Sequence, residues 1–140
     1  MAQSAQKPSR PLPRPGVYVE TEPFWEAAKQ HKLLLQYDTD TGQYQWLPRP
    51  VSIYNGKQNL EWREASGRGT LYSWTLSYVA WPGHADRAPY MCALVELEEG
   101  VRILTNLYNY EGVELRDGLP VKLMWETLSE DFEYPAFEPA

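Results

Sequence analysis

The alternation of side chains between positions 70 and 80 constrains the fold more than any other stretch of this sequence. Large apolar residues occupy every second position and small hydroxyl residues separate them: Tyr72, Trp74, Leu76, Tyr78 and Ala80, with Ser73, Thr75 and Ser77 between. A period of two over about ten residues predicts a long, half-buried, strongly curved β-strand with the large residues on one face. Gly67 and Gly69 just before it predict a bulge or tight bend.

Three later segments extend this pattern. "YMCALVELEEGVRILTNLYNY" predicts a hairpin that turns at Glu98, Glu99 and Gly100. "VKLMWETL" alternates again, and the acidic tail predicts a last short strand at 134–137. The fold class expected is therefore mainly β, with a five-stranded Greek-key barrel of the OB type, although an open sandwich would satisfy the same pattern.

The region before the barrel predicts a helix and a hairpin. Thr21 is a candidate N-cap, and a short helix is expected from Pro23 to His31, with His31 as a cation at its C-terminal end. A helix this short must dock onto other elements to be stable. Strands are expected at 33–37 and 44–47, closed by the turn "DTDTG".

The composition of the chain argues against several classes of protein. The chain has 140 residues, the size of one domain with a small appendage, and a net charge of −6, which argues against a nucleic-acid binder. The single cysteine excludes a disulfide framework within the chain. No run approaches the roughly 20 apolar residues of a membrane span. Without an apolar signal core at the start, the expected location is cytoplasmic.

Five segments in order carry a resemblance to a known family. They are "PFWEAAKQHKLLLQ", a two-turn hairpin containing "LPRP", "LEWREASGRGTLYSWT", "PYMCALVELEEGVRILTNL" and "LRDGLPVKLMWE". Together they resemble the zinc-ribbon/OB-fold family of unknown-function domains associated with thiolases and acyl-CoA. The resemblance implies a helix with a rubredoxin-like ribbon at 17–62 and an OB barrel at 63–140. Before them, residues 1–16 are rich in proline and poor in apolar residues, which predicts a flexible arm.

The resemblance also implies a function. Members of this family serve as accessory subunits of thiolase-fold enzymes that form or cleave carbon–carbon bonds beside a CoA thioester, including acyltransferases, thiolases and steroid side-chain retro-aldolases. The expected partner is a thiolase-fold subunit in a hetero-oligomer, with an acyl-CoA as substrate of the complex. No cofactor, nucleic acid or membrane contact is expected for this chain itself.

The ribbon departs from the family at its ligand positions. Where the family carries two Cys-x-x-Cys-Gly knuckles, this sequence has Asp38, Thr41, Ser52 and Asn55, and keeps Gly42 and Gly56. One carboxylate, two hydroxyls and an amide are a poor ligand set for structural zinc. We therefore expect no zinc, and expect these side chains to stabilise the turns by hydrogen bonds to the backbone.

Candidate contact residues for a partner or an acyl-CoA come from the helix, the "WLPRP" stretch and the long loop at 81–90. They are Phe24, Trp25, Trp46, Pro48, Arg49, Trp81, His84, Arg87 and Tyr90. For each, an ordinary core or solvated role is the competing interpretation. Cys92 lies in an apolar strand, which favours a small buried hydrophobe over a nucleophile. A single-stranded nucleic-acid binder is the alternative function, since OB barrels with aromatic platforms perform it.

Overall fold

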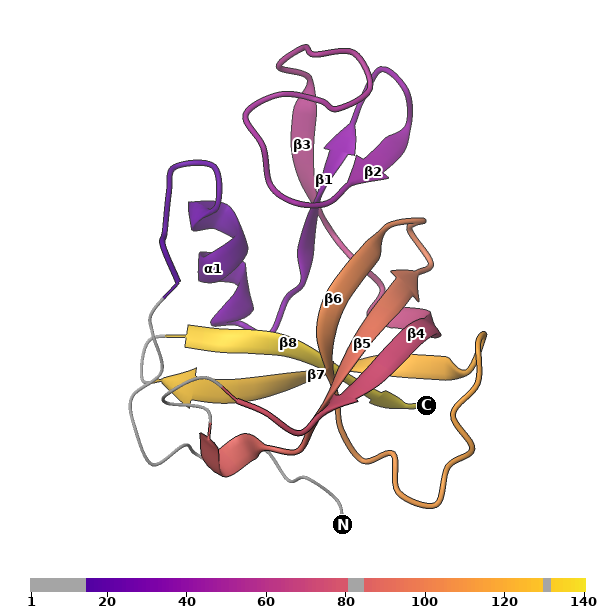
Figure 1. Ribbon diagram of the computed structural model, residues 1–140. Helices are drawn as coiled ribbons and strands as arrows, with labels where there is room; N and C mark the ends of the chain where they lie inside the picture. The colour runs from indigo at the N-terminus through magenta and orange to yellow at the C-terminus, as the bar shows by residue number, and fades with distance from the viewer. Residues whose placement is uncertain (1–14, 81–84, 130–131) are drawn as a thin grey trace.

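A computed structural model describes residues 15–80, 85–129 and 132–140. One α-helix comes first, a three-stranded sheet follows, and a closed five-stranded barrel completes the chain. Figure 1 shows the small sheet at one end of the barrel, with the helix beside it. The predicted class, mainly β with an N-terminal helix and an OB-type barrel, is confirmed.

The small sheet consists of β1 (Leu34–Asp38), β2 (Gln43–Gln45) and β3 (Leu60–Glu64), in the order β2-β1-β3. Both pairings are antiparallel, so β1 is hydrogen-bonded on both edges. The first two strands agree with the sequence to within a residue or two. The sequence pattern does not separate β3 from the strand that follows it.

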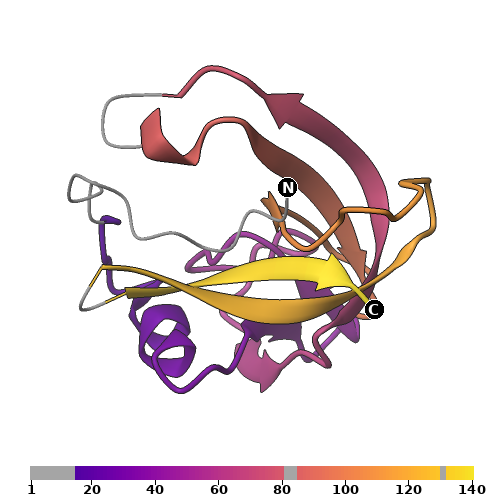
Figure 2. The same cartoon turned by 90° about the horizontal axis from the view of Figure 1, so that it is seen from below.

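The barrel contains β4 (Arg68–Ser77), β5 (Tyr90–Leu97), β6 (Arg102–Leu107), β7 (Pro120–Ser129) and β8 (Phe132–Pro139), in the order β4-β5-β6-β8-β7. A short 3₁₀ helix, η1 (Ala85–Arg87), precedes β5. Closure depends on one parallel pair, Leu107 with Phe137. Figure 2 shows β7 and β8 as a long ribbon across the bottom of the barrel. The last strand is eight residues long, twice the expected length.

The alternation of buried and half-buried side chains along the strands shows where the barrel core lies. Every second residue of β5, starting at Met91, is buried, and the residues between are half-buried. The inward residues form one hydrophobic cluster with the helix and the small sheet. Its fully buried large members are Leu33, Leu35, Leu71, Leu97, Ile103, Leu107 and Phe137. Because the cluster spans the barrel and the small sheet, the ribbon shares its core with the barrel.

The expected face of β4 is wrong at one residue, because a bulge interrupts the alternation. Leu71 pairs with Val95, and Ser73 pairs with Leu94, so Tyr72 is an extra residue without a partner. Its ring lies on the outer face, 3.8 Å from the guanidinium carbon of Arg102. Only Trp74 and the residues after it keep the predicted phase.

Gly69 marks a close approach rather than the bulge itself. A Cβ at this position would lie 2.5 Å from the carbonyl oxygen of Glu96 on β5. The missing side chain therefore lets β4 pass β5 at short distance.

The helix α1 (Glu22–Ala28) is shorter than predicted, and its capping differs. The Thr21 hydroxyl bonds back to Tyr18 and does not cap the helix. His31 lies beyond the helix in a left-handed conformation (φ 58°). Its ring stacks on Trp125 of β7, and its Nε2 lies 3.3 Å from Glu133 of β8. His31 therefore links the helix end to the barrel. No helix among the described residues is long and apolar enough to cross a membrane.

Candidate functional site

The two turns of the small sheet have the same backbone geometry. The N–H of Gly42 donates to the carbonyl of Asp38 (2.8 Å), and the N–H of Gly56 donates to the carbonyl of Ser52 (2.9 Å). Both glycines are left-handed, with φ of 71° and 70°. This conformation explains why each turn ends in glycine. The two turns, residues 38–42 and 52–56, are called the knuckles below.

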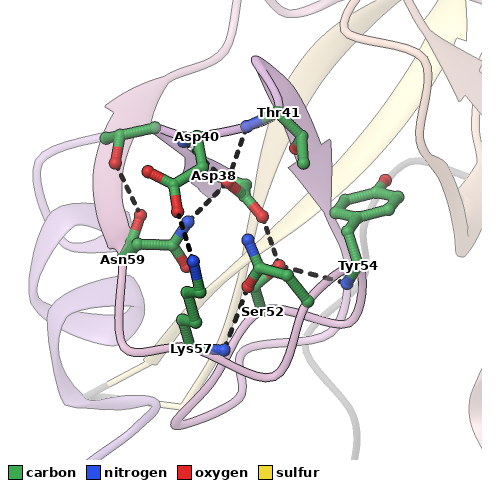
Figure 3. Close-up of polar contacts among 9 residues, drawn as sticks. Asp38, Asp40, Thr41, Ser52, Tyr54, Lys57 and Asn59 are labelled. Atoms are coloured by element: carbon green, nitrogen blue, oxygen red, sulfur yellow. Dashed lines mark hydrogen bonds and ion pairs between the residues drawn. The ribbon is translucent and has the colours of Figure 1, made fainter.

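The carboxylate of Asp38 lies between the two knuckles and is fully buried (Figure 3). Its Oδ1 accepts hydrogen bonds from the backbone N–H of Asp40 (2.8 Å) and Thr41 (2.9 Å) and from the amide of Asn59 (2.7 Å). Its Oδ2 accepts a hydrogen bond from the Ser52 hydroxyl of the second knuckle. One side chain therefore connects both knuckles and the segment before β3.

The second knuckle is closed by its own polar side chains (Figure 3). The hydroxyl of Ser52 accepts from the N–H of Tyr54 (3.1 Å), and the amide oxygen of Asn55 accepts from the N–H of Lys57 (3.0 Å). The prediction that these residues form Asx and Ser/Thr turns is confirmed for Asp38, Ser52 and Asn55. Thr41 donates its backbone N–H to Asp38, and its side chain also helps to lower the pKa of that carboxyl.

The network keeps Asp38 charged. Burial raises the pKa of the carboxyl, but the hydrogen bonds from Ser52 and from the backbone of Thr41 and Asp40 outweigh it, so the pKa lies below its ordinary value. A charged, buried carboxylate is tolerated because donors surround it.

These residues do not fit zinc. Structural zinc takes four thiolate or imidazole ligands in a tetrahedron. The four ligand positions offer one carboxylate, and hydrogen-bond donors already occupy it. Among the described residues, no group of three or more His, Cys, Asp or Glu side chains is arranged to hold a metal ion.

Two buried glutamines hold the second knuckle to the hairpin, and no sequence pattern predicts their burial. The Gln36 amide exchanges two hydrogen bonds with the backbone of Arg49, each 2.8 Å, and accepts another from Gln45 (2.8 Å). Gln45 in turn accepts from the N–H of Ile53 (2.9 Å). Exposed glutamines would have the same sequence signature, so burial alone distinguishes them.

Aromatic residues join the helix, the ribbon and the barrel. The ring of Phe24 is buried and meets Trp25 and Trp46 edge-on, with centroids 5.0 and 5.4 Å away. Trp25 packs against Phe132 and Tyr134 of β8. A side chain as buried as Phe24 offers little surface to a partner, so its main role is to fix the helix. Trp46 and Pro48 are half-buried, and Arg49 is exposed.

A buried polar cluster lies in the barrel. Arg87 of η1 forms an ion pair with Glu126 of β7, and the hydroxyl of Tyr108 donates to the same carboxylate at 2.5 Å. The side chains of Arg87 and Glu126 are 9% and 2% exposed. Burial and the bond to Glu126 raise the pKa of Tyr108. Arg87 was predicted as a partner or acyl-CoA contact, but its side chain is buried and its guanidinium is paired with Glu126.

The other predicted residues are placed as follows. Tyr90 opens β5 and is half-buried. Trp81 and His84 lie outside the described residues. Burial raises the pKa of the Cys92 thiol, which disfavours the thiolate that a nucleophile needs.

An exposed apolar surface, missed by the predicted residue set, lies on and just after β4. Trp74 is 38% exposed, Tyr78 75% and Val79 82%. Trp74 sits opposite Ala93, which is buried, so its ring is on the inward side of the strand. It remains accessible because β4 pairs with β7 only as far as Thr70. Single exposed apolar residues are common, but neighbouring large ones mark interaction surfaces.

The fold and the two knuckles define a class of protein: a small ribbon of the zinc-binding type followed by an OB barrel. Two family descriptions match in this order, "ChsH2, rubredoxin-like zinc ribbon domain" over residues 25–51 and "ChsH2, C-terminal OB-fold domain" over residues 62–126. The chain belongs to the ChsH2 family, also designated DUF35. The family expected from the sequence is confirmed.

Two curated relatives are longer than this chain. It is 34% identical over 138 residues to a "Probable enoyl-CoA hydratase alpha subunit" of Thermomonospora curvata, covering 99% of this chain and 43% of the relative. It is 32% identical to the "3-oxo-4,17-pregnadiene-20-carboxyl-CoA hydratase alpha subunit" of Mycobacterium tuberculosis, covering 90% of this chain and 40% of the relative. The chain thus spans less than half the length of these two relatives.

A solved structure matches nearly end to end. A chain of the "Ltp2-ChsH2(DUF35) aldolase" superposes with a TM-score of 0.79 at 32% identity, covering 90% of this chain and 98% of that chain.

Proposed function

We propose that this chain is an accessory subunit of a thiolase-like enzyme complex that acts on acyl-CoA thioesters. It stabilises the catalytic partner and helps to shape the acyl-CoA site. The CoA thioester is the substrate of the complex, and the chain itself binds no cofactor.

One observation carries this proposal: the chain covers 98% of a chain in an aldolase assembly. The hydratase relatives are covered only to 43% and 40%. The aldolase comparison therefore weighs more for the reaction class, and we propose a partner that forms or cleaves a carbon–carbon bond. Both hydratase subunits carry enoyl-CoA or carboxyl-CoA in their names, which supports a CoA thioester as substrate.

The described residues suit an assisting role better than a catalytic one. Glu126 and Arg87 neutralise each other inside the barrel, and the Cys92 thiol is held protonated. His31 is stacked on Trp125. In this proposal the thiolase-fold partner supplies the reactive groups.

For docking to the partner we propose the exposed surface of Trp74, Tyr78 and Val79. We add the two exposed apolar side chains of the ribbon, Leu47 and Ile53. Both groups carry large apolar side chains that are exposed to solvent. Seven contact residues expected from the sequence remain predictions in addition to these: Trp25, Trp46, Pro48, Arg49, Trp81, His84 and Tyr90.

Affinity purification of the tagged chain from its host, with mass spectrometry of the bound proteins, tests the proposal. We expect a thiolase-like enzyme in stoichiometric amount, and a complex larger than this chain in size-exclusion chromatography. A monodisperse monomer that brings no such enzyme would refute the accessory role.

Two variants on one strand test the docking surface. Trp74→Ala removes a large ring from the proposed contact, whereas Thr75→Ala alters the opposite face of the same strand. A central interface Trp commonly contributes about 2 kcal/mol or more, so we expect a roughly thirtyfold or larger loss of partner affinity for Trp74→Ala. Equal affinities for the two variants would remove β4 from the interface.

The single-stranded nucleic-acid alternative gains no support. The net charge is −6, and the arginine over the exposed Tyr72 is paired with Glu96. Arg68 and Arg63 are likewise paired with glutamates. Binding of single-stranded DNA or RNA at low salt would revive it.

A further inference from the structure

The buried Asp38 carboxylate stands at one of the four positions where the resemblance places zinc ligands, and it joins the two knuckles. It accepts four hydrogen bonds from three chain segments: two backbone N–H groups of its own knuckle, the Ser52 hydroxyl of the second knuckle, and the Asn59 amide before β3. Figure 3 shows these donors around a single carboxylate. Ser52 and Asn59 are 14 and 21 residues away in sequence, so the contacts are tertiary.

These donors compensate the buried Asp38 carboxylate for the loss of its hydration. An ionised carboxylate without partners is very unfavourable in a buried position, whereas charge-assisted hydrogen bonds are shorter and stronger than neutral ones. Both oxygens of the Asp38 carboxylate therefore accept hydrogen bonds from the protein, and these donors already neutralise the site without a metal. The Asn59 Oδ1 beside them is buried and has no hydrogen-bond partner among the described residues.

We propose that the Asp38 carboxylate cross-links the two knuckles in place of the zinc ion of the ribbon family, so that this ribbon folds without a metal. The proposal does not depend on the identity of the catalytic partner. It concerns the ribbon of the isolated chain and is tested there.

A second set of contacts supports a metal-independent ribbon. Gln36 and Gln45 connect the hairpin to residues 49–53 through buried amide hydrogen bonds. The second knuckle is therefore held from two sides, by Asp38 at one end and by the glutamines along its approach. Zinc-dependent small domains unfold without metal because metal binding supplies their folding free energy.

Asp40 provides a matched control for Asp38. It lies two residues away in the same knuckle, but its carboxylate is half exposed and lies 3.7 Å from the Nζ of Lys57, which is itself exposed. Asp38→Ala should speed amide hydrogen exchange at Thr41 and Tyr54 by about ten- to a hundredfold, the loss expected for hydrogen bonds to a charged group. Asp40→Ala should leave these amides unchanged within about twofold. The amide of Leu97 in the barrel, bonded to Val101, serves as an internal reference.

Asp38→Asn keeps the volume and one acceptor oxygen, so it tests the same idea if the alanine variant fails to fold. We expect about a tenfold increase in exchange at Thr41 and Tyr54, because the charge is lost. Equal exchange in Asp38→Asn and Asp40→Asn would overturn the proposal.

The metal is measured on the wild-type chain. Elemental analysis should find far less than one zinc per chain, and exchange at Thr41 and Tyr54 should be the same in EDTA and in added zinc. One equivalent of zinc, or loss of protection in EDTA, would overturn the proposal.

Discussion

The ion pair of Arg87 and Glu126 makes the sharpest stability prediction. Both side chains are nearly inaccessible, and Tyr108 uses the same carboxylate as its acceptor. Glu126→Leu keeps a similar volume but removes the buried carboxylate that pairs with the guanidinium of Arg87. Breaking a buried pair from one side costs about 3–5 kcal/mol, because the remaining charge is desolvated. For a chain of this size, that lowers the melting temperature by roughly 10–15 °C.

Removing the whole cluster should undo most of this loss. Arg87→Met/Tyr108→Phe/Glu126→Leu replaces all three polar side chains of the cluster with apolar ones, and apolar replacements of buried ion pairs are often neutral or stabilising. We therefore expect the triple variant to be more stable than Glu126→Leu alone. Tyr108→Phe by itself should cost about 1 kcal/mol, since Glu126 keeps its bond to Arg87.

Urea unfolding followed by circular dichroism gives the free energies, and thermal melts give the midpoints. Glu61→Leu is the matched control, because Glu61 pairs with Arg63 at the surface, with both side chains more than 40% exposed. Such a pair should contribute about 1 kcal/mol at most. If Glu126→Leu costs no more than Glu61→Leu, or if the triple variant is no more stable than the single one, the reasoning about desolvation is refuted.

Three further predictions concern the barrel and the ribbon. The pKa values of Tyr108 and Tyr134 are raised, so the unfolded chain loses phenol protons near pH 10 while the folded chain keeps them, and the free energy of unfolding falls as pH rises above about 10. Urea unfolding at a series of pH values should show a smaller fall for Tyr108→Phe than for the wild type. The same fall in both would contradict the raised pKa of Tyr108. Gly69→Ala places a Cβ 2.5 Å from the Glu96 carbonyl oxygen and should lower the free energy of unfolding by about 1–3 kcal/mol. The neighbouring Thr70→Ala should lower it by less than about 0.5 kcal/mol. Equal melting temperatures for the two variants would contradict the close approach. Placing cysteine at the four ligand positions of the knuckles should create a tetrahedral site that binds one zinc per chain. Elemental analysis and the spectra of the cobalt-substituted protein measure this binding. Failure to bind would show that the knuckle backbone no longer matches that of the family. The variant carries Asp38→Cys, Thr41→Cys, Ser52→Cys and Asn55→Cys.

The strands were predictable where alternation is unbroken. In β5 every second residue is apolar and buried, so its pattern alone places the core face. In β4 the same kind of pattern gives the wrong face for Tyr72. The bulge there depends on how β4 shares its edges between β5 and β7, and that is a property of the closed barrel.

The site divides in the same way. The glycines and short polar residues predicted both knuckles and their Asx and Ser/Thr turns, because such bonds join residues two or three apart. The role of Asn59 was not predictable, since an asparagine in a polar stretch looks like any surface residue. The pairing of Arg87 with Glu126 joins residues 39 apart and reversed the expectation of an exposed arginine.

By itself, therefore, the sequence determined the element types, the two knuckles and the loss of the zinc ligands, since each of these depends on local spacing and on residue chemistry. Tertiary structure alone decided which polar side chains are buried together. Burial turns Asp38 from a turn residue into the link between the knuckles, and turns Arg87 and Glu126 into an internal ion pair. The physical reason is that desolvation depends on segments brought together from distant parts of the chain, and no local pattern records it.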